Sequence, residues 1–276
     1  MPSGRRSNAS PRCTGPRTPR PPRRGGNLPA VGGVATEETS PDWTPSGPVR
    51  LGVVIPAYDE EARLPRTLAR MVEYYSDQDY SWSVTVVSDG STDRTEEIVR
   101  EFSRAEPRVQ LLALTPNRGK GAAVRTGMLS VNAELLLFCD ADLATPQEET
   151  AKLLAAIEGG TPIAIGSRPL RDSRLEVRQP LYREMLGRLF NKAVQLLAVP
   201  GIDDTQCGFK MFRRDAAREV FSRCKIDGFG FDFEALMVAH DLGLPIAEVG
   251  VRWSHQEGSK VSMLRDGSRM LKELVG

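Results

Sequence analysis

Two aspartates, Asp140 and Asp142, directly follow an apolar run in the stretch L-F-C-D-A-D-L-A-T-P at positions 137–146. Carboxylate oxygens are the hard ligands that Mg²⁺ and Mn²⁺ prefer. Residues two positions apart at a strand end point to the same side, so both carboxylates can face one ligand. A metal held there would neutralise charge on a departing nucleotide. The spacing therefore predicts a site for Mg²⁺ or Mn²⁺ and a nucleotide diphosphate.

A lysine, Lys120, stands between two glycines in N-R-G-K-G at positions 117–121. Glycine lets a backbone approach a ligand closely, and an ammonium group is a compact positive charge for a phosphate. The sequence contains neither the P-loop pattern nor the glycine pattern of dinucleotide-binding folds. We therefore expect a diphosphate site of another type.

The segments that must position these groups alternate between strands and helices. Strands are predicted at 51–56, 84–87, 109–114, 135–139 and 163–166, and helices at 60–75, 93–102, 121–129 and 147–157. This order implies right-handed crossovers and an α/β fold, with a mainly parallel sheet covered by helices on both faces.

Polar motifs follow four of these strands. They are P-A-Y-D-E at 56–60, S-D-G-S-T-D at 88–93, N-R-G-K-G and D-A-D. Each motif alone has a structural explanation, as Asp93 can simply cap a helix. Ligands of parallel sheets bind at the carboxyl ends of the strands, so the four motifs together predict one binding rim.

The first 48 residues differ in composition from the rest. They are rich in Pro, Gly, Ser, Thr and Arg and show no apolar periodicity, so we expect a disordered tail at 1–48 and one folded domain at 49–276. Seven arginines and three acids give the tail a charge of +4, and the whole chain carries +1, which leaves the folded part at −3. That charge is not typical of a nucleic-acid-binding domain. The tail is interpreted as a solvated linker or an over-extended start site, in preference to an arm that contacts anionic lipid or nucleic acid.

Cysteine usage and hydropathy indicate the compartment. The four cysteines, Cys13, Cys139, Cys207 and Cys224, form no C-x-x-C pair, which favours a reducing compartment over a disulfide framework or a zinc site. No apolar run reaches the ~18 residues that a membrane-spanning helix needs. We expect a cytoplasmic protein whose membrane contact is peripheral.

The motifs resemble those of glycosyltransferase family 2, whose catalytic domain has the GT-A fold. The resemblance rests on V-V-I-P-A-Y-D-E (53–60), V-S-D-G-S-T-D (87–93), N-R-G-K-G-A-A-V-R-T-G (117–127) and D-A-D-L (140–143). Further along, G-S-R (166–168), D-T-Q-C-G-F-K (204–210), F-D-F-E (231–234) and G-S-K (258–260) are similar to the dolichyl-phosphate β-glucosyltransferase branch, with the mannosyltransferases more distant. The resemblance extends from about residue 50 to the C-terminus, and D-T-Q-C-G-F-K is its most selective motif.

The resemblance implies a donor site. The family's nucleoside pocket matches four residues here: Pro56, Tyr58, Glu60 and Asp89. Asp89 matches the carboxylate that meets the base. Asp140 matches the carboxylate near the ribose and the metal, and Asp142 matches the principal metal ligand.

The resemblance also implies an acceptor site, in which Arg168 and Arg183 meet the acceptor phosphate. Lys260, in a glycine-flanked loop, is expected to contact a phosphate as well. Asp204 is the first acidic candidate for a catalytic base and has equal weight as a structural hydrogen-bond acceptor. The amphipathic segments 182–197 and 261–275 either pack on the core, which is favoured for the first, or lie in the headgroup region of a membrane.

Two further residues have more than one interpretation. Asp232 is a helix N-cap or a residue near the sugar, and Trp253 fills the core, which is favoured, or stacks on a sugar. The sequence departs from the family at Ser88, where many relatives have Asp, and at Ala144, where the mannosyl branch has a metal-binding Gln. It also shows no N-terminal transmembrane anchor like that of the eukaryotic glucosyl enzymes.

The chemistry follows from the acceptor. A lipid phosphate has a second pKa of about 6 and is a nucleophile at neutral pH without a strong base. Positioning and charge neutralisation then supply most of the catalysis, which fits a sequence with only two histidines. We predict an inverting transferase that moves a sugar, with glucose from UDP-glucose preferred, onto a polyprenyl or dolichyl phosphate. The alternatives are GDP-mannose or a UDP-N-acetylhexosamine as donor, or a degenerate transferase retained as a membrane scaffold.

Overall fold

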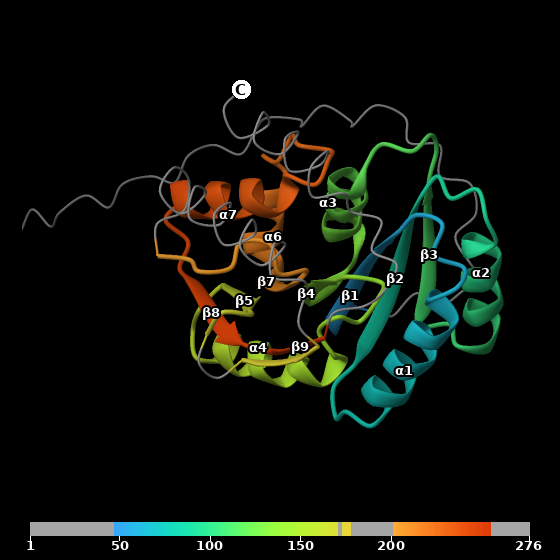
Figure 1. Cartoon of the computed structure of the whole chain (residues 1–276), viewed down its shortest axis with the longest axis horizontal. Helices are drawn as coiled ribbons and strands as arrows, with labels where there is room; N and C mark the ends of the chain where they lie inside the picture. Colours follow the sequence, from blue (N-terminus) through green and yellow to red (C-terminus); the bar gives the residue numbers. More distant parts are fainter. Residues whose placement is uncertain (1–46, 171–172, 178–200, 255–276) are drawn as a thin grey trace, which may run out of the picture. The chain divides into compact units, whose positions relative to one another are not determined.

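The computed structural model describes residues 47–170, 173–177 and 201–254 (Figure 1). The amphipathic segments 182–197 and 261–275 lie outside these residues, as do Arg183, Lys260 and the tail up to residue 46. The predictions made for them stay predictions.

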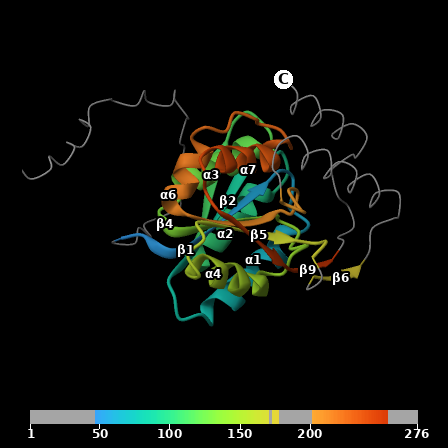
Figure 2. The same ribbon diagram turned by 90° about the vertical axis from the view of Figure 1, so that its left-hand side faces the viewer.

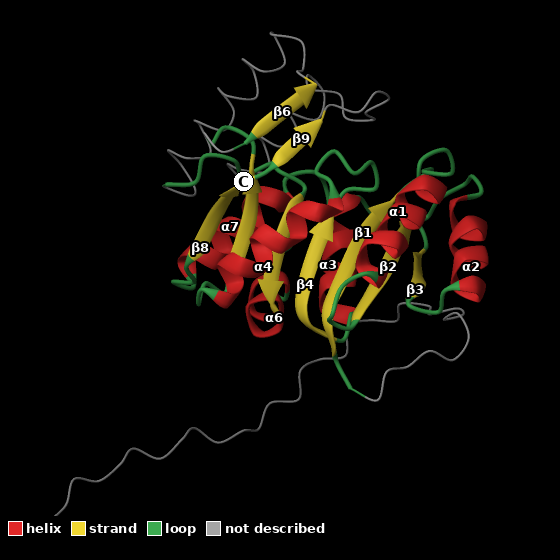
Figure 3. Ribbon diagram, turned by 90° about the horizontal axis from the view of Figure 1, so that it is seen from below, coloured by secondary structure: helices red, strands yellow, loops and turns green. Residues whose placement is uncertain are grey.

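The described residues form a seven-stranded sheet in the order β3-β2-β1-β4-β7-β5-β8 (Figure 3). The strands are β1 (Val49–Ala57), β2 (Trp82–Asp89), β3 (Val109–Leu114), β4 (Ala133–Cys139), β5 (Ile163–Ser167), β7 (Phe209–Arg213) and β8 (Ile246–Gly250). All neighbouring pairs are parallel except those of β7, which runs antiparallel to both β4 and β5. The prediction of a mainly parallel α/β sheet is confirmed.

Helices cover both faces of this sheet (Figure 1). One face carries α1 (Leu64–Ser76), α2 (Thr95–Ala105) and α4 (Thr150–Glu158), which follows the short 3₁₀ helix η1 (Gln147–Glu149). The other face carries α3 (Lys120–Ser130), α6 (Arg214–Phe221) and α7 (Phe231–Asp241).

Strand β4 shows why the sheet is covered on both sides. Leu135 and Leu137 are buried against the layer of α1 and α4, whereas Leu136 and Phe138 are buried against the layer of α3 and α7. A strand with both faces buried reads as a continuous apolar run, which is the pattern that the sequence shows before Asp140.

Helix α1 begins later than predicted. The sequence pattern places its start at residue 60, but the helix starts at Leu64, with Pro65 in its first turn. Proline fits there because its missing N–H would have no partner within the helix. The residues before Leu64 form a turn and stay at the rim of the sheet.

The reversed strand β7 brings an additional segment to the rim. The chain enters an antiparallel strand where its parallel neighbours end, so residues 204–208, just before β7, lie at the carboxyl ends of β4 and β5. A two-stranded parallel ribbon of β6 (Arg174–Val177) and β9 (Arg252–Ser254) lies beyond the carboxyl ends of β5 and β8 (Figure 2 and Figure 3). It is tied to the rim by a hydrogen bond from the Ser254 amide to the Ala144 carbonyl at 2.9 Å.

Among the residues that the structure describes, no helix is both long and apolar enough to cross a membrane.

Candidate active site

The chain leaves β4 through a tight turn that carries Asp140 and Asp142. The amide of Asp140 donates to the carbonyl of Gly208 at 3.2 Å. The hydroxyl of Thr67, on α1, donates to the carbonyl of Ala141 at 2.6 Å. The turn is therefore held by the segment before the neighbouring strand β7 and by α1, at the rim where the strand order predicts it.

The two carboxylates of this turn repel each other when both are ionised. Burial raises the pKa of Asp142 and the charge of Asp140 raises it further, against smaller opposing effects of the Ala144 amide and Lys120. A divalent cation stabilises such a pair, so the donor set fits Mg²⁺ or Mn²⁺. Within residues 47–170, 173–177 and 201–254, no three His, Cys, Asp or Glu side chains gather as a metal site. A metal here would take its remaining ligands from the diphosphate and water.

Lys120 forms an ion pair with Asp140, with 2.6 Å between Nζ and Oδ1. Burial lowers the pKa of Lys120, but the carboxylates of Asp140 and Asp232 outweigh this effect, and the pKa is raised. The ammonium also lies 5.5 Å from the centre of the Phe138 ring. Lys120 is therefore a charged group at the carboxylate pair, as the prediction of a diphosphate site requires.

The glycines on both sides of Lys120 have a role within the chain itself. A Cβ at Gly119 or Gly121 would overlap the carbonyl oxygens of Asp227 and Ile226. The amide of Gly121 donates to the Asp227 carbonyl at 2.8 Å. The sequence interpretation was that these glycines let a ligand approach the backbone. The structure shows that they let the loop before α7 pack closely against the start of α3.

Gly208, in the D-T-Q-C-G-F-K motif, packs directly on the carboxylate of Asp140. A Cβ at position 208 would stand 2.5 Å from Cγ of Asp140 and 2.8 Å from its Oδ1. Only glycine fits this position without displacing the carboxylate. The most selective motif of the sequence thus contacts the D-A-D turn.

Asp89, at the end of β2, holds the loop that leads to Lys120. Its Oδ1 accepts the amide of Arg118 at 2.9 Å, and its Oδ2 accepts the amide of Gly119 at 2.7 Å. The side-chain amide of Asn117 donates to the Asp89 carbonyl at 2.9 Å. Carboxylate oxygens have further lone pairs, so this arrangement leaves capacity for a nucleobase N–H.

The other predicted nucleoside residues lie at the end of β1. Pro56 is buried within the strand, next to Val87 of β2. The Tyr58 side chain beyond it is exposed, with 40% of its surface accessible. Glu60 forms an ion pair with Arg63 at 3.1 Å. The structure therefore brings Tyr58 and Glu60 to the rim, while Pro56 lies within the strand beneath them.

Asp59, which the sequence interpretation missed, ties the ends of β1 and β2 together. Its Oδ1 accepts the amide of Thr92 at 2.7 Å, and its own amide donates to the Ser91 hydroxyl at 3.2 Å. Its φ of 52° lies in the left-handed region, which aspartate tolerates better than most residues. The signal was present in P-A-Y-D-E, but a loop acid gives no indication of its partner.

Ser88, at the end of β2, is fully buried. Its hydroxyl donates to Glu96 Oε1 at 2.9 Å and lies 3.1 Å from the Ser91 hydroxyl. A carboxylate at position 88 would oppose the charge of Glu96. A neutral hydroxyl at position 88 instead donates a hydrogen bond to Glu96.

Arg168 and Asp204 form a bidentate ion pair at the end of β5. Nε of Arg168 lies 2.6 Å from Oδ2 of Asp204, and Nη2 lies 2.8 Å from Oδ1. Asp204 is completely buried, and burial alone would raise its pKa, but the guanidinium outweighs this effect and the pKa is lowered. A carboxylate with a lowered pKa and both oxygens engaged favours the structural one of the two predicted roles.

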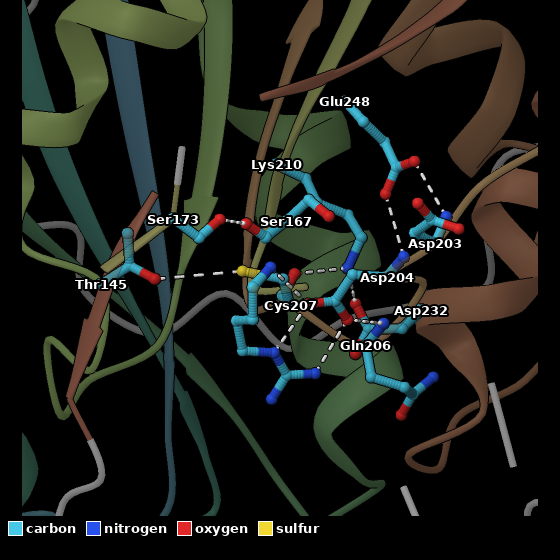
Figure 4. Close-up of polar contacts among 11 residues, drawn as sticks. Thr145, Ser167, Ser173, Asp203, Asp204, Gln206, Cys207, Lys210, Asp232 and Glu248 are labelled. Atoms are coloured by element: carbon cyan, nitrogen blue, oxygen red, sulfur yellow. Dashed lines mark hydrogen bonds and ion pairs between the residues drawn. The ribbon is translucent and has the colours of Figure 1, made fainter. Parts of the chain in front are cut away.

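The segment around Asp204 is fixed by a second carboxylate (Figure 4). Glu248, on β8, accepts the amides of Asp203 at 2.8 Å and Asp204 at 2.9 Å. On the other side, the Arg168 guanidinium lies 5.6 Å from the centre of the Trp253 ring. The prediction that Trp253 fills the core is wrong, because this side chain is only half-buried at the rim.

Lys210 and Asp232 form a buried ion pair beneath the site (Figure 4). Lys210 is 1% exposed, and its Nζ donates to Asp232 Oδ1 at 2.5 Å and to the Cys207 carbonyl at 2.6 Å. The N-cap of α7 is Gly230, so the interpretation of Asp232 as an N-cap is wrong. A lysine within the apolar strand sequence F-K-M-F was the signal for this pair, which the sequence interpretation did not use.

Residues 52–221 match the family described as Glycosyl transferase family 2. The chain belongs to this family. A dolichyl-phosphate beta-glucosyltransferase of Drosophila melanogaster is 38% identical over 249 residues, which cover 86% of this chain and 76% of the relative. The human protein of the same name is 35% identical, with 87% and 78% covered, and that of Saccharomyces cerevisiae is 32% identical, with 82% and 73% covered. The predicted resemblance is confirmed, and the chain is a glycosyltransferase.

Solved structures agree with the fold. Glucosyl-3-phosphoglycerate synthase from Mycobacterium tuberculosis, in complex with UDP, superposes with a TM-score of 0.60 at 19% identity, covering 82% of this chain and 79% of that chain. The same enzyme has been solved with Mn²⁺ and UDP-glucose, with a TM-score of 0.60. The prediction of a GT-A fold is confirmed.

Proposed function

We propose that this protein transfers glucose from UDP-glucose to a dolichyl or polyprenyl phosphate, with inversion at the anomeric carbon. The relatives with 32–38% identity are named for the dolichyl-phosphate reaction, and the solved neighbour binds UDP-glucose with Mn²⁺. Both kinds of similarity support the proposal, the first for the acceptor and the second for the donor.

On the donor side, Asp140 and Asp142 would hold Mg²⁺ or Mn²⁺ against the diphosphate. A bound metal supplies charge stabilisation to the departing UDP. Lys120, already at the carboxylate pair, adds a third positive charge at the same place. Tyr58, Glu60 and Asp89 would contact the nucleoside from the ends of β1 and β2.

On the acceptor side, Arg168 would bind the lipid phosphate, with Arg183 and Lys260 as further phosphate contacts. The Arg168 guanidinium has a fixed orientation because Asp204 holds it through two hydrogen bonds. A guanidinium oriented in this way can present its remaining N–H groups to a phosphate. Because that phosphate is already ionised at neutral pH, it can attack the sugar without a base. Asp204 then acts as a positioning residue and does not remove a proton.

The main support for the proposal is the contact between two motifs, D-A-D at 140–142 and D-T-Q-C-G-F-K at 204–210. The D-T-Q-C-G-F-K motif contacts Asp140 through Gly208 and holds Arg168 through Asp204. The same seven residues therefore support the predicted donor site and the predicted acceptor site. The acceptor is membrane-bound, so we also propose that the protein works peripherally at the cytoplasmic face of a membrane.

A donor screen tests this proposal. Purified protein, Mn²⁺ and a short polyprenyl phosphate in detergent are incubated with radiolabelled UDP-glucose, GDP-mannose or UDP-N-acetylglucosamine, and label in the organic phase is counted. The proposal expects lipid-soluble label from UDP-glucose alone. Label from another donor identifies a different sugar, and no label from any donor supports a degenerate scaffold.

A further inference from the structure

Lys120 lies where a metal bound to Asp140 would place its own positive charge. Its ammonium is 2.6 Å from Oδ1 of Asp140. A divalent cation coordinates a carboxylate oxygen at about 2.0–2.2 Å. An ammonium and a dication at one oxygen repel each other strongly at such separations, so the two compete for Asp140.

The backbone of Lys120 cannot move away to relieve this competition. Gly119 and Gly121 are packed against the carbonyl oxygens of Asp227 and Ile226, and Asp89 holds the Gly119 amide at 2.7 Å. Any displacement of the ammonium must therefore take place in the side chain.

The side chain of Lys120 has room to make this displacement. It is 25% exposed, and that of Asp140 is 33% exposed, so the pair opens to the rim. On the inner side, the rings of Phe138 and Phe231 lie 5.5 Å and 5.8 Å from the ammonium and offer no hydrogen-bond acceptor of comparable strength. The inner carboxylate of Asp232 already pairs with Lys210 at 2.5 Å. The favourable direction of movement is outward, toward a ligand.

We propose that Lys120 is an exchangeable counter-ion, which occupies Asp140 in the nucleotide-free protein and moves to the diphosphate when metal and nucleotide bind. The proposal rests on the proposed function, because it requires a diphosphate at this rim. It assigns Lys120 a second role beside phosphate binding. Metal alone must displace Lys120 without giving it a new partner, whereas metal with nucleotide supplies one. Metal and nucleotide therefore bind with positive coupling, and the coupling is reciprocal.

Binding of Mn²⁺ to the full chain tests this role without an activity assay. Free and bound Mn²⁺ are measured by electron paramagnetic resonance, with and without UDP, for wild type and Lys120→Met, which keeps the length of the side chain and removes its charge. Wild type should bind Mn²⁺ weakly alone and about tenfold more tightly with UDP. Lys120→Met should bind Mn²⁺ alone several-fold more tightly than wild type and show a smaller coupling, of which the part that comes from direct contact between metal and diphosphate remains.

Thermal unfolding provides a second measurement that does not depend on equal stability of the variants. Each protein is compared with its own metal-free state, since a ligand of the folded state raises the melting temperature. Without UDP, Mn²⁺ should stabilise Lys120→Met more than wild type. Lys225→Met, which removes the charge of an exposed lysine, should behave as wild type in both measurements.

Two outcomes separate this inference from the proposed function. If wild type binds neither Mn²⁺ nor UDP when both are present, the donor site is wrong and the inference fails with it. If wild type binds both, but Lys120→Met binds Mn²⁺ alone no more tightly and keeps the full coupling, only the exchange role of Lys120 is overturned.

Discussion

The Cα atom of Gly208 lies against the carboxylate of Asp140, so closely that a Cβ at position 208 would stand 2.5 Å from Cγ of Asp140. The contact joins a motif before the reversed strand β7 to the turn after β4. It orients one of the two carboxylates proposed to hold the metal. The packing of the sheet, and not only the local sequence, therefore sets the geometry of the donor site.

Gly208→Ala tests this contact. The added methyl group must displace the Asp140 carboxylate, and small misplacements of a catalytic group cost up to about 100-fold in rate. We expect kcat to fall by at least about tenfold and UDP binding with Mn²⁺ to weaken, as measured by steady-state kinetics and calorimetry. Gly47→Ala, where nothing lies within 4 Å of the new Cβ, is the control. Full activity of Gly208→Ala would show that the contact does not orient Asp140.

Arg168→Lys tests the acceptor site. Lysine cannot reproduce the bidentate pair with Asp204 or a fork toward phosphate. We expect the KM for polyprenyl phosphate to rise about tenfold or more, because hydrogen bonds to charged groups contribute about 1.5–3 kcal/mol. Calorimetry with UDP and Mn²⁺ should give wild-type donor affinity.

A matched control for Arg168→Lys exists next to β3, an edge strand of the sheet. Arg108 forms a bidentate pair with Glu106, with distances of 2.7 and 2.6 Å, and lies 4.0 Å from the centre of the Trp82 ring. Arg108→Lys should leave both KM values unchanged. Loss of UDP affinity in Arg168→Lys with a normal KM for the lipid would move Arg168 to the donor side.

Asp204→Asn tests the pair by its pH dependence. The pKa of Asp204 is lowered below its ordinary value of about 3.9, so its ionised form stabilises the folded protein above about pH 4. This stabilisation is lost as the pH falls through the folded pKa. Removing one partner of a buried ion pair costs about 3–5 kcal/mol.

Urea unfolding of wild type and Asp204→Asn measures this difference. The variant should be less stable by a constant amount between pH 7 and about pH 5, and the gap should narrow below about pH 4. A gap that stays constant down to about pH 3 would mean that the carboxylate charge of Asp204 does not stabilise the fold.

Deletion of residues 1–46 tests the predicted domain boundary. The sequence of this segment has no periodic apolar face to bury, so its removal should leave the melting temperature within about 1 °C of wild type. Binding to vesicles with anionic lipid should weaken only if the arginines of the tail contact them. A marked drop in melting temperature would place part of the segment in the folded domain.

Local patterns predicted which polar motifs share the rim, because the parallel strands β1, β2 and β4 each end at one of these motifs. The apolar runs before Tyr58, Asp89 and Asp140 each end at a polar motif, and right-handed crossovers then bring these ends to one rim. Strand and helix positions followed from periodicity in the same way.

The remaining features depend on contacts between residues far apart in the chain. The reversal of β7 is not encoded in its own five residues, F-K-M-F-R, but in its pairing with β4 and β5. The partners of Lys210 and Arg168 follow from that reversal, as does the contact of Gly208 with Asp140. The glycines beside Lys120 were assigned to a ligand because sequence alone does not show which backbone approaches them.

The most direct test of the central claim is glucose transfer by Asp142→Asn. Label transferred from UDP-glucose to polyprenyl phosphate is measured over a Mn²⁺ titration for wild type, Asp142→Asn and the control Asp241→Asn, whose side chain is 79% exposed. We expect metal-dependent transfer by wild type and by the control, and no transfer above background by a folded Asp142→Asn protein at any metal concentration. Wild-type transfer by Asp142→Asn at saturating Mn²⁺ would contradict the assignment of the metal and diphosphate to this turn.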